Sequence, residues 1–285
     1  MKLQFITTGH LKEMLWFKDD DDFRAGMNYV AVTSVATGIV VLSFILMSNH
    51  VHFLIVGDNE TAFRFINEYK RRYSMYYENK YGIKKFLRKN DVFIKEVPMD
   101  GESAERAIAY IQMNCVAANI CAHPSQYPWG TGNCFFGKAD HGVKRVRDIT
   151  KREAIRLTHS HVDLPGDFVI GAEGFILPRS YVKVEFVESV FRTPLRMNYF
   201  QTHSSKAGVR LNGPRTASFI DQTLVKSACD LCQSLFGKDH WAHLSEDEVG
   251  VLLKHLRYRF SADVAQLARV LGTSYDKIAQ QLDSA

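Results

Sequence analysis

The chain has 285 residues, of which 46% are hydrophobic and 24% are charged, and its formal net charge is +5. These values are ordinary for a globular protein with at least one sizeable core. Its five cysteines show no framework of a small secreted domain, so we expect free thiols, Cys229 and Cys232 included, and a reduced cytoplasmic setting. Val30 to Met47 carries no charge, but threonine, serine and glycine interrupt it, so we expect a soluble chain without a membrane span.

Strands and helices alternate over the first part of the chain. We expect a strand at 5–8, then a helix from the acidic run at 19–22 to about Ala36 that is ended by Gly38, and then strands at 40–47 and 50–56. A second helix is expected to be capped by Asp58 or Asn59, to run to about Tyr81 and to be ended by Gly82. A strand at 93–97 and a helix capped by Ser103 that runs to about Asn119 follow. This order describes an α+β fold with a ferredoxin-like antiparallel sheet, on which the last helix packs.

A loop rich in proline and aromatic residues, Ala122 to Gly130, ends this unit, so we place a first domain at 1–136. A basic connecting region of mixed structure is expected at 137–215, with seven basic and three acidic residues from Lys138 to Arg156 and a strand-like stretch at 182–186. A mainly helical module follows at 216–285. Its last two helices, around Gly272, have the spacing of a helix-turn-helix. With five basic and six acidic residues from Ser245 on, both a DNA-reading module and a structural or partner-binding hairpin stay open.

Two histidines form the candidate centre of chemistry. His50 and His52 lie on a predicted strand, so their side chains point to the same face while Val51 and Phe53 enter the opposite one. Two adjacent imidazoles can clamp one metal ion and leave positions open for a third ligand and for substrate oxygens. A second histidine pair, His159 and His161, lies in loop-like sequence, and we expect it to be an exposed polar loop or to contact phosphates.

Positive charge is concentrated between Arg64 and Glu96, where ten basic and four acidic residues stand. Tyrosines and a phenylalanine are interleaved with them. This composition suits a surface that contacts the phosphate backbone and stacks on bases. It equally suits a solvated helix face whose tyrosines belong to the core, and the segment alone does not separate the two.

Three stretches resemble the single-tyrosine HUH transposases, and within that superfamily the transposases associated with repetitive extragenic palindromes. They are Met47–Ile55 with its histidine–hydrophobe–histidine motif, Tyr69–Tyr73 as the basic helix, and Tyr110–Ala118 as the nucleophile helix, followed by His123-Pro124 and Tyr127-Pro128-Trp129. The resemblance covers roughly residues 1–136. The chain departs from the family at Cys115, where proline is usual, and this affects the local helix geometry.

The resemblance implies an activity and a set of site residues. Tyr110 would be the nucleophile, and Asn114, one helical turn later, would join His50 and His52 in binding Mg²⁺ or Mn²⁺. The tyrosine would cleave single-stranded DNA beside a hairpin, form a 5′-phosphotyrosine and pass the strand to another 3′-OH, as in DNA transposition. The DNA-binding residues would be Lys70, Arg71, Arg72 and Tyr73.

The resemblance also implies a bacterial, nucleoid-associated protein, and whether it is a monomer or a homodimer stays open. Tyr73, Tyr76 and Tyr77 are alternative nucleophiles, but none has an oxygen-bearing ligand four positions on in the family order. Other functions remain as alternatives: another HUH nicking enzyme such as a replication initiator or relaxase, a DNA-binding regulator of the same fold without cleavage, or a metal-dependent hydrolase of small phosphoesters. The last would leave the basic, tyrosine-rich helix unexplained.

Overall fold

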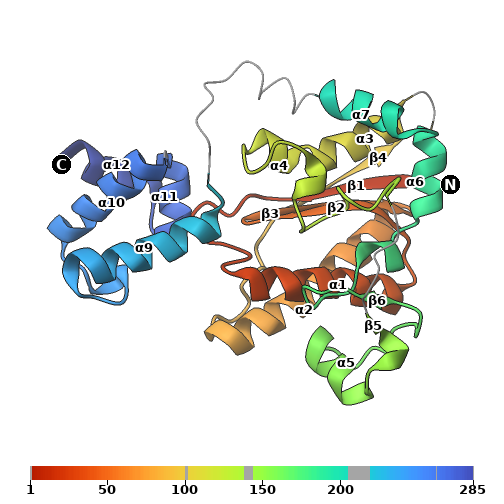
Figure 1. Cartoon of the computed structure of the whole chain (residues 1–285), viewed down its shortest axis with the longest axis horizontal. Helices are drawn as coiled ribbons and strands as arrows, with labels where there is room; N and C mark the ends of the chain where they lie inside the picture. The colour runs from red at the N-terminus through yellow and green to blue at the C-terminus, as the bar shows by residue number, and fades with distance from the viewer. Residues whose placement is uncertain (1, 100–101, 138–143, 205–218, 261, 285) are drawn as a thin grey trace.

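A four-stranded antiparallel sheet forms the centre of the computed structural model, which describes residues 2–99, 102–137, 144–204, 219–260 and 262–284 (Figure 1). The strand order is β2-β3-β1-β4. A short pair, β5 with β6, lies apart from this sheet. The strand bounds are β1 Leu3–Thr8, β2 Val41–Met47, β3 His50–Val56, β4 Val92–Val97, β5 Lys144–Arg145 and β6 Val169–Ile170.

Helices cover both faces of the sheet (Figure 1). On one face α1 and α2 pack against each other, and the ring of Phe53 on β3 contacts Phe65 and Tyr69 of α2 at centroid distances of 5.2 and 5.3 Å. On the other face lie α3 and α4. The helix bounds are α1 Asp20–Thr37, α2 Asn59–Tyr81, α3 Ser103–Gln112, α4 Asn114–Ala117, α5 Lys151–Thr158, α6 Val184–Phe191, α7 Pro194–Thr202, α9 Asp221–Phe236, α10 Glu246–Phe260, α11 Val264–Leu271 and α12 Tyr275–Ser284.

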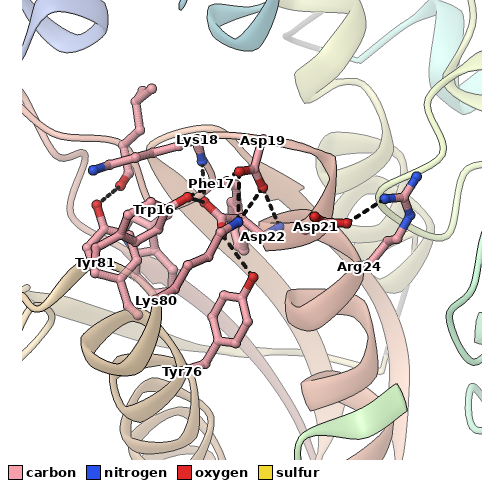
Figure 2. A network of polar contacts seen from close by, with 12 residues as sticks. Trp16, Phe17, Lys18, Asp19, Asp21, Asp22, Arg24, Tyr76, Lys80 and Tyr81 are labelled. Carbon is pink, nitrogen blue, oxygen red and sulfur yellow. Dashed lines mark hydrogen bonds and ion pairs between the residues drawn. The ribbon is translucent and has the colours of Figure 1, made fainter. Parts of the chain in front are cut away.

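Helix α1 begins in a compact polar network (Figure 2). Asp19 caps it by accepting a hydrogen bond from the backbone N–H of Asp22 (2.9 Å). Asp22 is fully buried, and its carboxylate accepts a hydrogen bond from Lys80 Nζ (2.8 Å). The hydroxyl groups of Tyr76 (3.1 Å) and Tyr81 (2.8 Å) donate to the same carboxylate. A buried carboxylate needs such partners because its desolvation is costly, so the network fixes the start of α1 to the end of α2.

The predicted elements of the first domain are confirmed, with differences at their ends. Gly38 and Gly82 adopt left-handed conformations (φ 68° and 73°) that end α1 and α2, as expected. The last predicted helix is the main departure. Its N-cap position is occupied by Glu102 rather than Ser103, without a side-chain capping hydrogen bond, and the helix is interrupted at Met113 so that α3 and α4 are separate.

Side chains of the middle region pack into the core of the sheet. Buried side chains such as Phe168, Ile176 and Phe191 belong to the same core cluster as the sheet. The strand expected at 182–186 is wrong: α6 begins at Val184, and only Val182 bridges to Val41 of β2. A short apolar run fits a strand or a buried helix equally well, so the length and pattern of residues 182–186 did not distinguish the two structures.

The last part of the chain is helical, as predicted, and α9 to α12 enclose a core of their own. Gly272 takes a left-handed conformation (φ 66°) between α11 and α12, as the predicted corner requires. Cys229 and Cys232 of α9 are free thiols. The proposed boundary near residue 215 falls within 205–218, outside the described residues.

Asp221, at the start of α9, ties this module to the turn between β2 and β3. Its buried carboxylate accepts a hydrogen bond from Ser48 Oγ and pairs with Arg269 (Nε to Oδ2, 3.2 Å). Gln222 donates a further hydrogen bond to the carbonyl oxygen of Phe17. The helical module therefore rests against the end of the sheet at which His50 begins β3 (Figure 1).

Within the described residues, no helix has both the length and the apolar character that crossing a bilayer requires.

Candidate active site

The two histidines of the motif lie side by side on one face of β3. Both are almost fully buried, with 6% of His50 and 4% of His52 exposed. Their ring centroids are 4.8 Å apart and the rings are perpendicular (88°). Strand alternation explains the shared face, because Val51 and Phe53 between and after them are fully buried on the side of α1 and α2.

Tyr110 reaches the same face from α3. Its ring meets that of His52 edge-on, at a centroid distance of 5.9 Å and an angle of 83°. Phe5 of β1 completes the group, since its ring lies 5.8 Å from Tyr110 and 5.7 Å from His52. Residues from β1, β3 and α3 thus converge on one point, although they are far apart in the sequence.

His50 is held by two neighbours. Its Nδ1 lies 2.9 Å from Asn49 Oδ1, and its ring stacks on that of His10 with centroids 3.7 Å apart. An amide oxygen can only accept, so Nδ1 carries the proton and the lone pair of neutral His50 is on Nε2. A metal-binding histidine is typically oriented in this way by a partner on its other ring nitrogen. The sequence analysis missed both neighbours, although Asn49 is next to the motif.

Asn114 lies one turn beyond Tyr110 but on a different helix from the one predicted. Because α3 ends at Gln112, Asn114 begins α4, so the two residues do not share one continuous helix face. The side chain is buried, and its Nδ2 donates to the carbonyl oxygens of Tyr110 (2.8 Å) and Ile111 (3.2 Å). These bonds occupy the amide nitrogen and leave the side-chain oxygen as the atom able to act as a ligand.

The two imidazoles are donors of a kind that divalent cations bind. Among the residues that the structure describes, no group of three or more His, Cys, Asp or Glu side chains is placed to hold a metal. A metal at this site would therefore be held by His50 and His52, with oxygen ligands from Asn114 or from substrate. Such a site keeps positions open for a phosphate, as a catalytic metal requires.

The alternative tyrosine nucleophiles are part of the core. Tyr73 and Tyr77 are fully buried, and their hydroxyl groups donate to the carbonyl oxygens of Trp16 and Leu15. Tyr76 donates to Asp22. Burial raises the pKa of all three phenols. The hydroxyl groups of these three tyrosines are thus engaged in hydrogen bonds on the side of α1 and α2, whereas Tyr110 lies on the opposite face of the sheet.

The predicted DNA-binding set needs correction. Tyr73 is fully buried, and Lys70 is largely buried with its Nζ donating to the carbonyl oxygen of Asn90, so neither lies at a surface that DNA reaches. Burial lowers the pKa of Lys70. Arg71 and Arg72 lie nearer the surface, but both pair with Glu68 (2.7 Å each) on the layer opposite Tyr110. Their contact with DNA stays a prediction.

Two further residues beside Tyr110 were missed by the sequence analysis. A cavity of about 380 Å³ is lined by Tyr110 and Arg106 of α3 and by Phe200 and His203 at the end of α7. Arg106 stands one helical turn before Tyr110 and lies over the ring of Phe200 (5.6 Å to the centroid). The i, i+4 spacing from Tyr110 could have identified Arg106. No sequence pattern predicts that His203 lies beside Tyr110, because α7 follows Tyr110 by more than eighty residues.

Fold and site together define the chain as a mixed α/β protein whose antiparallel sheet carries a histidine pair beside a helix-borne tyrosine. No protein-family model matches the chain, and no curated protein matches it. Among solved structures, the chain is similar to one described as a REP-associated tyrosine transposase bound to a REP hairpin. That match has 11% identity and a TM-score of 0.38, and covers 60% of this chain and 93% of the other.

Proposed function

We propose that the chain is a metal-dependent enzyme of the HUH type that cleaves and rejoins single strands of hairpin-containing DNA, as in DNA transposition. The observation that carries the proposal is the convergence of His50, His52 and Tyr110 on one face of the sheet. The strand order β2-β3-β1-β4, with α1 and α2 together on the far face, supports the ferredoxin-like arrangement expected of this class.

The chemistry assigned to Tyr110 is an in-line attack of its hydroxyl oxygen on the scissile phosphorus. The bond from phosphorus to the 3′ oxygen breaks, that oxygen takes up a proton and leaves as a 3′-OH, and the 5′ phosphate stays on Tyr110. The phenol proton passes to solvent. Attack by the 3′-OH of another strand reverses the step and joins that strand without a nucleotide cofactor, because the phosphoester bond has been kept.

His50 and His52 would hold the divalent cation, Mg²⁺ or Mn²⁺. When bound, the cation supplies charge stabilisation at the scissile phosphate. Asn49 keeps the Nε2 lone pair of His50 available, and the edge contact of His52 with Tyr110 supports a role for Tyr110 as a nucleophile beside the histidine pair.

The test uses a hairpin oligonucleotide labelled at its 3′ end, incubated with the protein and Mn²⁺ and then separated under denaturing conditions. The wild type is expected to retain label on the protein. Tyr110→Phe removes only the phenolic oxygen, so it is expected to form no adduct and still to bind the oligonucleotide in a native gel. Tyr76→Phe is the matched control and should form the adduct. Binding without any adduct in the wild type would instead indicate a DNA-binding regulator.

A further inference from the structure

The positive charge between Arg64 and Glu96 divides into two groups. On α2, Arg71 and Arg72 pair with Glu68, and Lys80 pairs with Asp19 and Asp22. Beyond α2, five basic side chains are exposed, and none of them takes part in an ion pair within the described part of the chain. We call these five the basic edge: Lys84, Lys85, Arg88, Lys89 and Lys95. Apart from Arg64 near the start of α2, the exposed and unpaired positive charge of this segment is therefore on the loop after α2 and on β4.

The basic edge adjoins the end of the sheet that carries His50. Asn90 Nδ2 donates to the carbonyl oxygen of Gly9 (2.8 Å), and the Gly9 N–H donates to the carbonyl oxygen of Asp91 (2.8 Å). Gly9 is followed by His10, whose ring stacks on His50. Lys70 braces the same loop through its bond to Asn90. A phosphate chain on this loop is thus next to the metal-binding histidines.

Phe93 of β4 is exposed on the face that carries the site. In the sheet register Phe93 lies opposite Thr7, and Thr7 lies opposite His52. Residues opposite each other in antiparallel strands point to the same face, so Phe93 and His52 share a face and stand two strand spacings apart, about 10 Å. Yet 59% of Phe93 is exposed, whereas Val97 at the other end of β4 is buried.

Lys95 extends this surface toward the nucleophile. It lies opposite Phe5, the residue whose ring contacts Tyr110 at 5.8 Å, so it points to the same face as Phe93. An exposed aromatic ring with a cation on the same face is the combination that binds unpaired nucleic acid, since rings stack on bases and cations contact phosphates. Duplex DNA offers no free base face to Phe93.

We infer that Phe93 and the basic edge bind the unpaired DNA strand that leads to Tyr110, with a base stacked on Phe93 and a phosphate on Lys95. The inference rests on the proposed function and adds the path of the substrate to it. It also replaces α2 with β4 and the preceding loop as the main DNA-binding surface.

The experiment measures binding in a Tyr110→Phe background, which prevents cleavage, to two hairpins that differ only in a single-stranded extension. Phe93→Ala is expected to weaken binding of the extended hairpin about 5- to 150-fold and to leave the blunt hairpin unchanged. Phe93→Trp should restore binding because it keeps a stacking ring. Phe63→Ala is the matched control, since Phe63 is 44% exposed but belongs to α2. It should change neither affinity.

Salt dependence tests the phosphate contact. Lys95→Gln should lower the slope of log affinity against log salt by roughly 0.7 for the single strand. Arg64→Gln, which removes an exposed charge from α2, should leave the slope unchanged. Equal loss of affinity for both hairpins would mean that the surface binds duplex, and loss of self-association in Phe93→Ala would mean that it binds a second copy. Either result overturns the inference.

The two proposals fail in different ways. If the wild type forms the Tyr110 adduct but Phe93→Ala binds and cleaves the extended hairpin as the wild type does, the inference is wrong and the proposed function stands. If the wild type forms no adduct, the proposed function is wrong. Binding of the two hairpins by wild type and Phe93→Ala then tests separately whether Phe93 binds an unpaired strand.

Discussion

At the scale of single residues, the site depends on how His50 and His52 are held. We expect His50→Ala or His52→Ala to abolish adduct formation and weaken metal binding, and EDTA to do the same to the wild type, because two imidazoles are the core of the donor set. Asn114→Ala should be milder, since water can replace one neutral ligand. Isothermal titration with Mn²⁺ and the labelled-oligonucleotide assay measure the two effects, and full cleavage in EDTA would rule out a metal-assisted mechanism.

Asn49 offers a finer test of the same site. Because it orients His50 through Nδ1 without occupying the metal side of the ring, Asn49→Ala should reduce metal affinity or activity by about 10- to 100-fold. The effect should be smaller than that of His50→Ala. Asn49→Asp keeps an acceptor at Nδ1 and serves as the control. A variant Asn49→Ala with wild-type metal affinity would show that the hydrogen bond has no such role.

The site could be predicted in part because a strand fixes the faces of its residues locally. Alternation alone placed His50 and His52 together. The neighbours His10, Arg106 and His203 come from other elements, and their positions depend on how those elements pack. For the same reason, the count of basic residues does not show that Glu68 pairs with Arg71 and Arg72 or that Lys70 is buried.

At the scale of elements, boundaries followed from local chemistry where a glycine or an acidic cap marks them, as at Gly38 and Gly82. The predicted boundaries were wrong where tertiary contacts determine the end of an element. The break between α3 and α4 occurs at Met113, which carries no helix-breaking chemistry. Position 115 is cysteine rather than proline, and the helix is nevertheless interrupted close by. The apolar run at 182–186 likewise became a helix because it packs on the sheet core.

The network at the start of α1 predicts a stability effect. Asp22→Asn should lower the free energy of unfolding by about 1–3 kcal/mol, because it leaves buried donors of Lys80, Tyr76 and Tyr81 with a weaker acceptor. Urea denaturation at pH 7 measures the change. The matched control is Asp21→Asn, an exposed residue paired only with Arg24, which should change stability by less than about 0.5 kcal/mol.

The same network predicts how stability responds to acid. Burial alone would raise the pKa of Asp19, but hydrogen bonds from Lys80 and from the backbone of Asp22 outweigh it and hold the pKa below its usual value. A lowered folded-state pKa gives stability that is present above the unfolded value, about 3.9, and is lost as the pH falls through the folded value. Asp19→Asn should therefore cost stability at pH 7 and progressively less below pH 4. An equal cost at both pH values would contradict this assignment.

At the scale of the whole molecule, the helical module and the site are connected through Ser48 and Asp221. These residues are 173 positions apart, so no local pattern predicts their contact. Ser48→Ala should cost about 1 kcal/mol of stability. It should also speed hydrogen exchange in the β2–β3 turn and reduce adduct formation, because that turn leads into His50. Ser234→Ala, at an exposed position of α9 away from this turn, is the control. Exchange unchanged at residues 48–50 would show that the module does not brace the site.

The most direct test of the account is to locate the DNA on the protein. The wild-type adduct with a hairpin oligonucleotide and Mn²⁺ is digested with nuclease and trypsin, and the peptides are analysed by mass spectrometry. We predict a nucleotide phosphate attached to Tyr110, and its loss when EDTA is present during the reaction. Attachment to Tyr73, Tyr76 or Tyr77, or an adduct that forms equally well in EDTA, would contradict the assignment of Tyr110 and the two histidines as the catalytic centre.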